Sequence, residues 1–498
     1  MHLRAFASAL VGPEGGPAED ILMMHGGSTG PEDTVDAQSF RQRRLQLIRN
    51  IREHRYTGED RSLLYKYALS PLAAYLTEMT PRALHPNAIT LLGVAATAVG
   101  FAAVMATTIF VRLPWSASSA FPAWLHLLLG LCFFAYQTLD NMDGKQARRT
   151  GTSSPLGYVV DHGCDAINST IGTLNLFVNL NVATYVGGDH TMRHWASLKQ
   201  WMLWETVAVG FFFNTWEEYH TGSLVLPVVN GASEGLTLLS CIAIVSAVRG
   251  DAWWEEEAPV SRSVGTAVEN SLSLPPDSLV GIKNNTCVVA LLGVACAFTI
   301  IGQLAKVYGI TVARSSRAKR DGEESDDGVV VGRFFPFVGL LPFLVTNAMV
   351  LAWRWCATSS ERLLEGHSTL LFIFCGCFHS RLTILLMVSH VCGVAYRPLT
   401  PTTMVTIVSL SALLFIRIAC PAVLAMRCPL DSIVLVLLLI LNAYGLFVLC
   451  WRTVIGMCFA LNTSMFGGRS ADTGGASPQD SGKCEFAETS SRNCKKLS

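Results

Sequence analysis

Apolar stretches long enough to cross a lipid bilayer recur along this chain, and they constrain its fold more than any other feature. Of its 498 residues, 51% are hydrophobic and only 15% are charged. Because a membrane-spanning helix needs about 20 apolar residues, we predict an all-α integral membrane protein with about ten transmembrane helices. The apolar stretches cover residues 87–111, 119–139, 158–186, 200–217, 232–249, 286–312, 334–355, 368–393, 402–426 and 430–458.

Two further segments near the N-terminus have helical character without being apolar enough to span a bilayer. Val35 to Arg55 has apolar residues at helical spacing among several arginines, and Ser62 to Leu76 is apolar with few charges. Such segments suit helices that lie on a membrane surface. We therefore expect interfacial amphipathic helices over residues 35–80.

The charged residues predict how the chain is oriented. Lys and Arg collect in cytosolic loops of membrane proteins, and here Lys145, Arg148 and Arg149 follow the second apolar stretch. We therefore expect that stretch to end at the cytosolic face and both termini to be cytosolic. Lys+Arg and Asp+Glu both number 37, so the chain has no general basic surface and nucleic-acid binding is not expected.

Four aspartates lie at the end of the second apolar stretch and at the start of the third. Asp140 and Asp143 are three residues apart, and Asp161 and Asp165 are four apart, so each pair lies on one face of its helix. An unpaired carboxylate at bilayer depth costs roughly 2.5–3.5 kcal/mol. Divalent cations bound by oxygen satisfy such a cluster, and Mg²⁺ combines carboxylates with substrate phosphate oxygens. The four residues are therefore predicted metal ligands.

The residues between these pairs suit a phosphate-bearing substrate. We expect Gly144 to let the backbone approach a ligand and Gly157 to let two helices come close. The small side chain of Ala147 should leave its face of the helix unobstructed. Arg148 is predicted to bind phosphate oxygens through its forked guanidinium. The adjacent Lys145 and Arg149 are better explained as ordinary cytosolic-loop residues.

The full pattern, Asp-x-x-Asp-Gly-x-x-Ala-Arg-x8-Gly-x3-Asp-x3-Asp, resembles the signature of the CDP-alcohol phosphotransferase family. The sequence around the motif, including His54-Arg55-Tyr56 and Pro86-Asn87-Ala88-Ile89-Thr90, is similar to the eukaryotic choline/ethanolamine phosphotransferase branch of this family. The likeness extends over about residues 54–235. Tyr158-Val159-Val160 departs from the branch without removing a motif position. The motif positions are Asp140, Asp143, Gly144, Ala147, Arg148, Gly157, Asp161 and Asp165.

This resemblance implies an activity. Phosphocholine or phosphoethanolamine would pass from CDP-choline or CDP-ethanolamine to diacylglycerol with release of CMP, at a pair of Mg²⁺ or Mn²⁺ ions held by the four aspartates. A base must take the hydroxyl proton, and we favour His162, with Asp165 as the alternative. Members of the branch are commonly homodimers. The C-terminal Lys495-Lys496-Leu497-Ser498 resembles a retention signal of the endoplasmic reticulum, and the Golgi is the alternative location.

Several residues keep two interpretations. Asn87 and Thr90, at the mouth of the first apolar stretch, either contact the nucleotide or, for Asn87, cap the helix. Glu217, Glu218 and Glu234 either reach the amine head group or Arg148, or are solvated surface groups. Two other functions use the same carboxylates, namely an ion or metal transporter and an inositol-specific CDP-alcohol phosphotransferase. A catalytically silent scaffold is disfavoured because all four aspartates are present.

These inferences divide the chain into six parts. Residues 1–34 are expected to be disordered and 35–80 to be interfacial, and 81–250 form the catalytic core. Residues 251–285 make a lumenal loop, 286–460 supply further transmembrane helices, and 461–498 form a disordered cytosolic tail.

Overall fold

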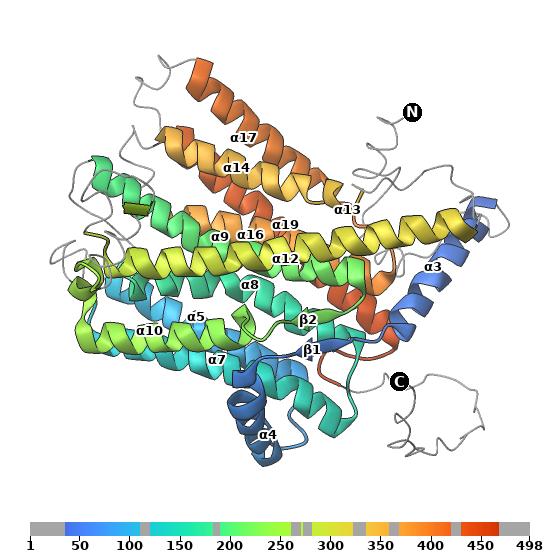
Figure 1. Ribbon diagram of the computed structural model, residues 1–498. Helices are drawn as coiled ribbons and strands as arrows, with labels where there is room; N and C mark the ends of the chain where they lie inside the picture. Colours follow the sequence, from blue (N-terminus) through green and yellow to red (C-terminus); the bar gives the residue numbers. More distant parts are fainter. Residues whose placement is uncertain are drawn as a thin grey trace, which may run out of the picture.

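The computed structural model describes residues 35–109, 120–182, 190–259, 270–271, 281–321, 335–357, 368–419 and 430–467. The predictions for residues 1–34 and for most of the tail after residue 461 fall outside this range. Within it, each of the ten predicted apolar stretches contains a helix, and the all-α fold class is confirmed. The helices run side by side as one bundle (Figure 1).

The first half of the chain supplies the helices that carry the motif. Three short helices adjoin the longer ones: η1 (Tyr65–Leu69) runs directly into α4, η3 (Gly231–Gly235) leads into α10, and η4 (Asp251–Glu255) follows α10. The longer helices are α3 (Val35–Glu53), α4 (Ser70–Met79), α5 (Pro86–Thr107), α7 (Ala123–Thr150), α8 (Pro155–Asn179), α9 (His190–Thr221) and α10 (Leu236–Arg249).

The second half adds a further set of helices beside the first. The central one, α16, packs against α8, α9 and α19, whereas α12 packs mainly on α9, and α14 on α17. The bounds are α12 (Asn284–Asp321), α13 (Phe335–Val338), α14 (Leu341–Ala357), α16 (Ser368–Cys392), α17 (Pro401–Ala419) and α19 (Leu430–Leu461).

Membrane crossing is supported by the length and composition of the helices. Among the described residues, seven helices are long and apolar enough to span a bilayer, and they include α5, α10, α12, α14, α16, α17 and α19. The chain is thus a multi-pass membrane protein. The remaining three of the ten, α7, α8 and α9, are not among these seven, and α7 and α8 carry the four aspartates. Their crossing stays a prediction.

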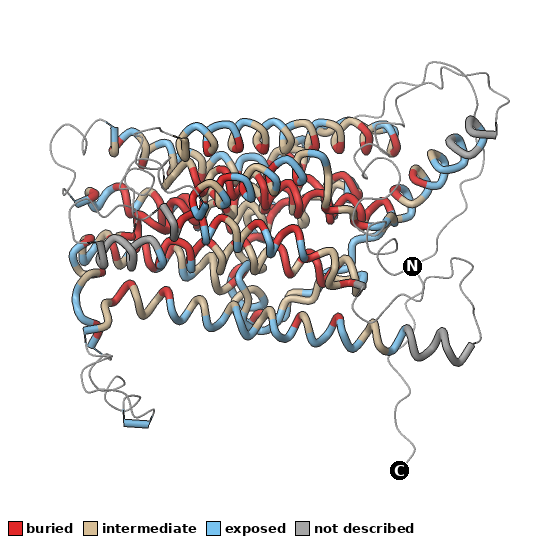
Figure 2. Tube along the Cα trace, turned by 90° about the horizontal axis from the view of Figure 1, so that it is seen from above, coloured by how far each residue is buried: buried red, intermediate tan, exposed pale blue. Residues whose placement is uncertain are grey.

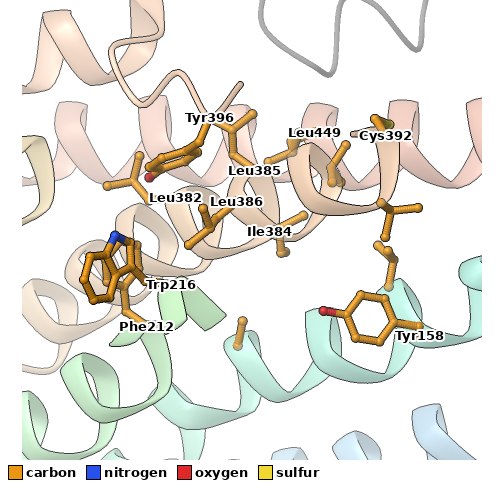
Figure 3. Packing of buried hydrophobic residues seen from close by; sticks show 14 of the residues in the cluster. Tyr158, Phe212, Trp216, Leu382, Ile384, Leu385, Leu386, Cys392, Tyr396 and Leu449 are labelled. Carbon is orange, nitrogen blue, oxygen red and sulfur yellow. The ribbon is translucent and has the colours of Figure 1, made fainter. Parts of the chain in front are cut away.

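The core of the bundle surrounds α16, which is buried along nearly its whole length. Buried residues gather in the middle of the bundle (Figure 2). Leu382 and Leu386 from α16 meet Phe212 and Trp216 from α9, and Tyr158 of α8 lies at the edge of the same cluster (Figure 3). Burial of such side chains gives roughly 1.5–3 kcal/mol each. The position of α8, and so of its two aspartates, is therefore fixed by packing in the interior.

Two ionisable side chains of α16 have hydrogen-bond partners in this interior. The Arg381 guanidinium donates to Thr400 Oγ1 at 2.6 Å and to Thr403 Oγ1 at 2.7 Å, and a ring nitrogen of His379 lies 2.8 Å from Asn347 Oδ1. Charged groups within a membrane are functional candidates by default. Here these contacts join α16 to its neighbours, which is a packing role.

A small parallel sheet at one end of the bundle was not predicted. Strand β1 (Gly58–Asp60) pairs with β2 (Leu224–Leu226), and Gly58 is aligned with Leu224. The pairing joins the segment before α4 to the segment after α9, so two parts of the chain far apart in sequence are fixed side by side (Figure 1). This sheet holds the segment that includes Tyr56 near the start of α8.

Candidate active site

Helices α7 and α8 form an antiparallel pair joined by a very short connection. Helix α7 continues past its aspartates to Thr150 and ends at Gly151, whose φ of 68° is a left-handed conformation that suits glycine. Helix α8 begins at Pro155, and the Ser154 side chain caps it by accepting a hydrogen bond from the Gly157 N–H at 3.1 Å. The aspartate pairs on the two helices therefore face each other across this turn.

Three of the four aspartates meet at one point. Asp140, Asp161 and Asp165 each place one carboxylate oxygen within 4.8 Å of the others, and all three side chains are half-buried. Asp161 Oδ1 is buried and has no hydrogen-bond donor among the described residues. A bound cation would offset the desolvation and the mutual repulsion of a buried carboxylate oxygen beside two further carboxylates. Oxygen ligands of this kind fit a hard divalent ion.

The fourth aspartate, Asp143, is placed by helix α5. Its Oδ2 accepts a hydrogen bond from Thr90 Oγ1 at 2.5 Å, and its side chain is buried. Thr90 also contacts its own helix, where Oγ1 lies 3.3 Å from the Pro86 carbonyl. The hydroxyl therefore orients the Asp143 carboxylate. This places Thr90 as a partner of a predicted metal ligand, a contact the sequence did not specify.

A tyrosine performs the corresponding task for Asp165. The Tyr136 hydroxyl donates to Asp165 Oδ1, and the ring is buried in α7. Sequence reasoning missed this residue. The available signal was its position, four residues before Asp140 and hence on the same face of the helix.

The small residues of the motif leave room for an arginine. A Cβ on Gly144 would lie 3.5 Å from a guanidinium nitrogen of Arg148, so the arginine folds back over the glycine. Arg148 is exposed, and within the described part of the chain its guanidinium has no hydrogen-bond acceptor. Ala147 is half-buried, and its carbonyl accepts the Thr152 N–H at 2.9 Å where the helix ends. Arg148 is thus free to bind an anion.

The flanking basic residues have structural partners instead. The Arg149 guanidinium donates to the carbonyls of Thr77 at 2.8 Å and Thr80 at 2.7 Å, and it lies 3.4 Å from a carboxylate oxygen of Glu78. Lys145 donates to Ser70 Oγ at 2.8 Å. Both residues fasten the end of α7 to α4. Only the arginine between them, Arg148, remains for a ligand.

Asn87 lies at the start of α5 beside Gly157. The alternative that Asn87 caps the helix is wrong, because His85 is the cap and its Nδ1 accepts the Asn87 N–H at 3.2 Å. Partial burial lowers the pKa of the His85 imidazole, which favours the neutral form that can accept this bond. The Asn87 side chain instead donates from Nδ2 to the Met465 carbonyl at 2.7 Å. A Cβ on Gly157 would lie 3.7 Å from Asn87 Oδ1.

His162 stands beside the carboxylate cluster among aromatic rings. Its Nε2 lies 3.9 Å from Asp161 Oδ2, and its side chain is 13% exposed. The ring centroid is 4.5 Å from that of Tyr158 and 5.5 Å from that of Tyr56. The imidazole therefore lies beside the carboxylate cluster, and its role as the base stays a prediction.

The three glutamates considered from the sequence have different surroundings. Glu218 is buried and accepts a hydrogen bond from the Tyr158 hydroxyl at 2.9 Å, which places it behind the aromatic rings around His162. Glu217 is paired with Lys306 of α12. Glu234 accepts from Ser62 Oγ at 2.5 Å and from the Asn230 N–H at 2.9 Å. Only Glu218 is next to the candidate site.

Comparisons with known proteins agree with this geometry. Residues 83–249 match the model of the CDP-alcohol phosphatidyltransferase family, and all eight motif positions fall inside that range. The chain carries a CDP-alcohol phosphatidyltransferase domain. The predicted resemblance is thus confirmed for α5 to α10. The helices after residue 249 and the segment with Tyr56 lie outside the matched domain.

Curated relatives match the transferase domain and its surroundings. Choline/ethanolaminephosphotransferase 2 of Arabidopsis thaliana is 39% identical over 214 residues, which are 43% of this chain and 49% of the relative. Choline/ethanolaminephosphotransferase 1 of Saccharomyces cerevisiae is 35% identical over 198 residues, 40% and 46% of the two chains. Both matches span about half of the relative's length. Choline/ethanolaminephosphotransferase 1 of Arabidopsis thaliana is 29% identical over 69% of this chain and 77% of its own length.

Proposed function

We propose that this protein transfers phosphocholine, phosphoethanolamine or both from the CDP-alcohol to diacylglycerol, releasing CMP and forming the phospholipid. The observation that carries the proposal is the meeting of Asp140, Asp161 and Asp165 at one point inside a CDP-alcohol phosphatidyltransferase domain. The names of the relatives in plants and yeast favour choline and ethanolamine as the head groups. We assign the catalytic core to residues 81–250.

The proposal includes a pair of divalent ions, Mg²⁺ or Mn²⁺, held by the four aspartates. The orphaned Asp161 Oδ1 and the three converging carboxylates support such a site. When bound, the ions would neutralise charge on the diphosphate of the CDP-alcohol. Thr90 and Tyr136 would orient Asp143 and Asp165, because each donates a hydrogen bond to one of them.

The residues around the cluster have roles in the transfer step. Arg148 would hold the diphosphate through its free guanidinium. The diacylglycerol hydroxyl oxygen forms the new bond to the phosphorus that carries the alcohol, and the bond from that phosphorus to the CMP oxygen breaks. His162 Nε2 would accept the hydroxyl proton, with an Asp165 carboxylate oxygen as the alternative. CMP leaves with the electron pair of the broken bond.

The location and assembly of the protein follow from the same proposal. The lysine and arginine residues after Asp143 favour a cytosolic active site, where soluble CDP-alcohols are accessible. Diacylglycerol would enter laterally from the bilayer, because we propose that α7 and α8, which carry the site, cross the membrane. We place the protein in the endoplasmic reticulum, or alternatively the Golgi, and expect a homodimer.

The test is transfer from labelled donors in membranes. Membranes from cells without their own transferase, expressing this chain, are given diacylglycerol, Mg²⁺ and labelled CDP-choline or CDP-ethanolamine. We expect label in the corresponding phospholipid, and loss of that label when the divalent ions are chelated. Label that enters lipid only from free inositol and a CDP-activated lipid would assign the inositol-specific reaction instead.

A further inference from the structure

The residues that follow the last helix lie across the start of α5. We call residues 462–467 the C-terminal strap. Its Met465 carbonyl accepts the Asn87 side-chain amide at 2.7 Å, and the Phe466 ring meets the His85 ring edge-on at a centroid distance of 6.3 Å. A Cβ on Gly467 would lie only 3.2 Å from His85 Cδ2. The strap thus contacts the transferase domain from outside its matched range.

The strap is a built turn rather than a loose end. Asn462 has a φ of 51°, the Thr463 N–H donates to the Cys458 carbonyl at 3.0 Å, and Ser464 Oγ donates to the Gly467 carbonyl at 2.5 Å. Just before it, Arg52 Nε of α3 donates to the Ala460 carbonyl at 2.7 Å. The end of α19 is therefore fixed at the end of the bundle where α3 and β1 lie (Figure 1).

This contact decides which way the Asn87 amide points. A backbone carbonyl only accepts hydrogen bonds, so the group facing Met465 must be the Asn87 nitrogen. The oxygen then faces the other way, toward Gly157 at the start of α8. Asn87 is only 4% exposed, so the burial around it resists a flip of the amide. A hydrogen-bond acceptor is therefore presented beside the transferase motif.

We propose that the C-terminal strap is a positioning element for nucleobase recognition, in which the Met465 carbonyl fixes Asn87 so that its Oδ1 accepts a hydrogen bond from the exocyclic amine of cytosine. The inference rests on the proposed function, in which a cytidine nucleotide would bind at the end of the bundle where α5 begins. Cytosine carries an amino donor at the position where uracil carries a carbonyl acceptor. With its oxygen toward Gly157, the Asn87 amide would select cytosine over uracil. A flipped amide would present its nitrogen instead and would lose that selection.

The test compares CMP with UMP as competitors of CDP-alcohol turnover in membranes carrying the full-length chain. Wild type should be inhibited by CMP at a concentration about tenfold or more below that of UMP, because a mismatched acceptor leaves a buried polar group unpaired. Phe466→Ala, which removes the ring contact with His85, should reduce this CMP-over-UMP ratio about threefold. Phe466→Tyr, which keeps an aromatic ring at this position, should have a CMP-over-UMP ratio near that of wild type. Thr463→Ala, within the strap but away from α5, is the matched control.

Two further variants separate the possible failures. Asn87→Ala should abolish the CMP-over-UMP preference, and deletion of residues 462–467 should lower it at least as much as Phe466→Ala. If Asn87→Ala lowers the preference but neither strap variant does, the positioning role is wrong. An unchanged ratio in all of these variants would overturn the inference while transfer itself continues. Absence of any CDP-alcohol transfer by wild type would instead overturn the proposed function.

Discussion

Thr90 Oγ1 lies 2.5 Å from Asp143 Oδ2, so α5 directly orients a carboxylate of α7 within the transferase domain. The two residues are 53 positions apart in the chain, and the contact joins α5 to α7 where both are buried. A partner that orients a metal ligand fixes its geometry and charge distribution. The contact would make Thr90 part of the proposed metal site without making it a ligand.

Replacement of Thr90 by valine tests this relationship. Thr90→Val keeps the shape of the side chain and removes the hydroxyl, so Asp143 loses its donor. Because loss of such a partner typically costs about 10- to 100-fold in metal affinity or activity, we expect the half-saturating Mg²⁺ concentration to rise about tenfold. Thr90→Ser, which keeps the hydroxyl, should remain near wild type. Equal Mg²⁺ dependence in Thr90→Val and wild type would contradict the role of Thr90.

Adjacent arginines on α7 offer a matched pair of variants. Arg148→Ala should raise the KM for the CDP-alcohol about tenfold or more, because a charge-assisted contact with phosphate contributes about 1.5–3 kcal/mol. Its thermal stability in detergent should be unchanged, because no acceptor in the described part of the protein depends on Arg148.

Arg149→Ala should show the reverse. It removes the guanidinium that donates to the carbonyls of Thr77 and Thr80, and within the described residues only the Thr77 carbonyl keeps a second donor, the Thr80 N–H. We expect a loss of stability of about 1–3 kcal/mol, measured as a lower thermal midpoint. The KM of the protein that remains folded should stay near wild type. If Arg149→Ala raised the KM and Arg148→Ala lowered only the stability, the two assignments would have to be exchanged.

The sequence predicted the helices and the cluster well because both follow from local chemistry. Bilayer length and apolar composition predict helices such as α5 and α16, and helical spacing predicts that Asp161 and Asp165 share a face. Packing determined the rest. That Tyr136 would reach Asp165, or that β1 would pair with β2, depends on contacts between distant segments, which a single sequence does not reveal.

Charge alone does not reveal which partner a basic residue contacts. Arg148 and Arg149 are neighbours in sequence, yet only the structure shows that Arg149 is engaged by α4. Asn87 was divided between capping and nucleotide binding, and the cap proved to be His85. The strap contact at Asn87 joins residues 378 positions apart, which is beyond any pattern of local spacing.

We propose His162 as the general base. Its Nε2 lies 3.9 Å from Asp161 Oδ2, and its ring lies beside the rings of Tyr56 and Tyr158. His162→Ala should lower the transfer rate about 100-fold or more, as expected for a lost general base, with little change in the KM for the CDP-alcohol. The pH–rate profile should also lose the limb that the base produces. An unchanged profile in His162→Ala would remove His162 from this role and leave Asp165.

The central claim is that the aspartate cluster is a divalent-metal site that transfers a phospho-alcohol. The most direct measurement is Mg²⁺-dependent transfer from CDP-choline and CDP-ethanolamine in membranes carrying wild type or Asp161→Asn at equal protein level. Metal ions contribute several kcal/mol to such steps, so Asp161→Asn should lower transfer from both donors about 100-fold or more at every Mg²⁺ concentration, while the protein still inserts. Full activity of Asp161→Asn with both donors would contradict the account.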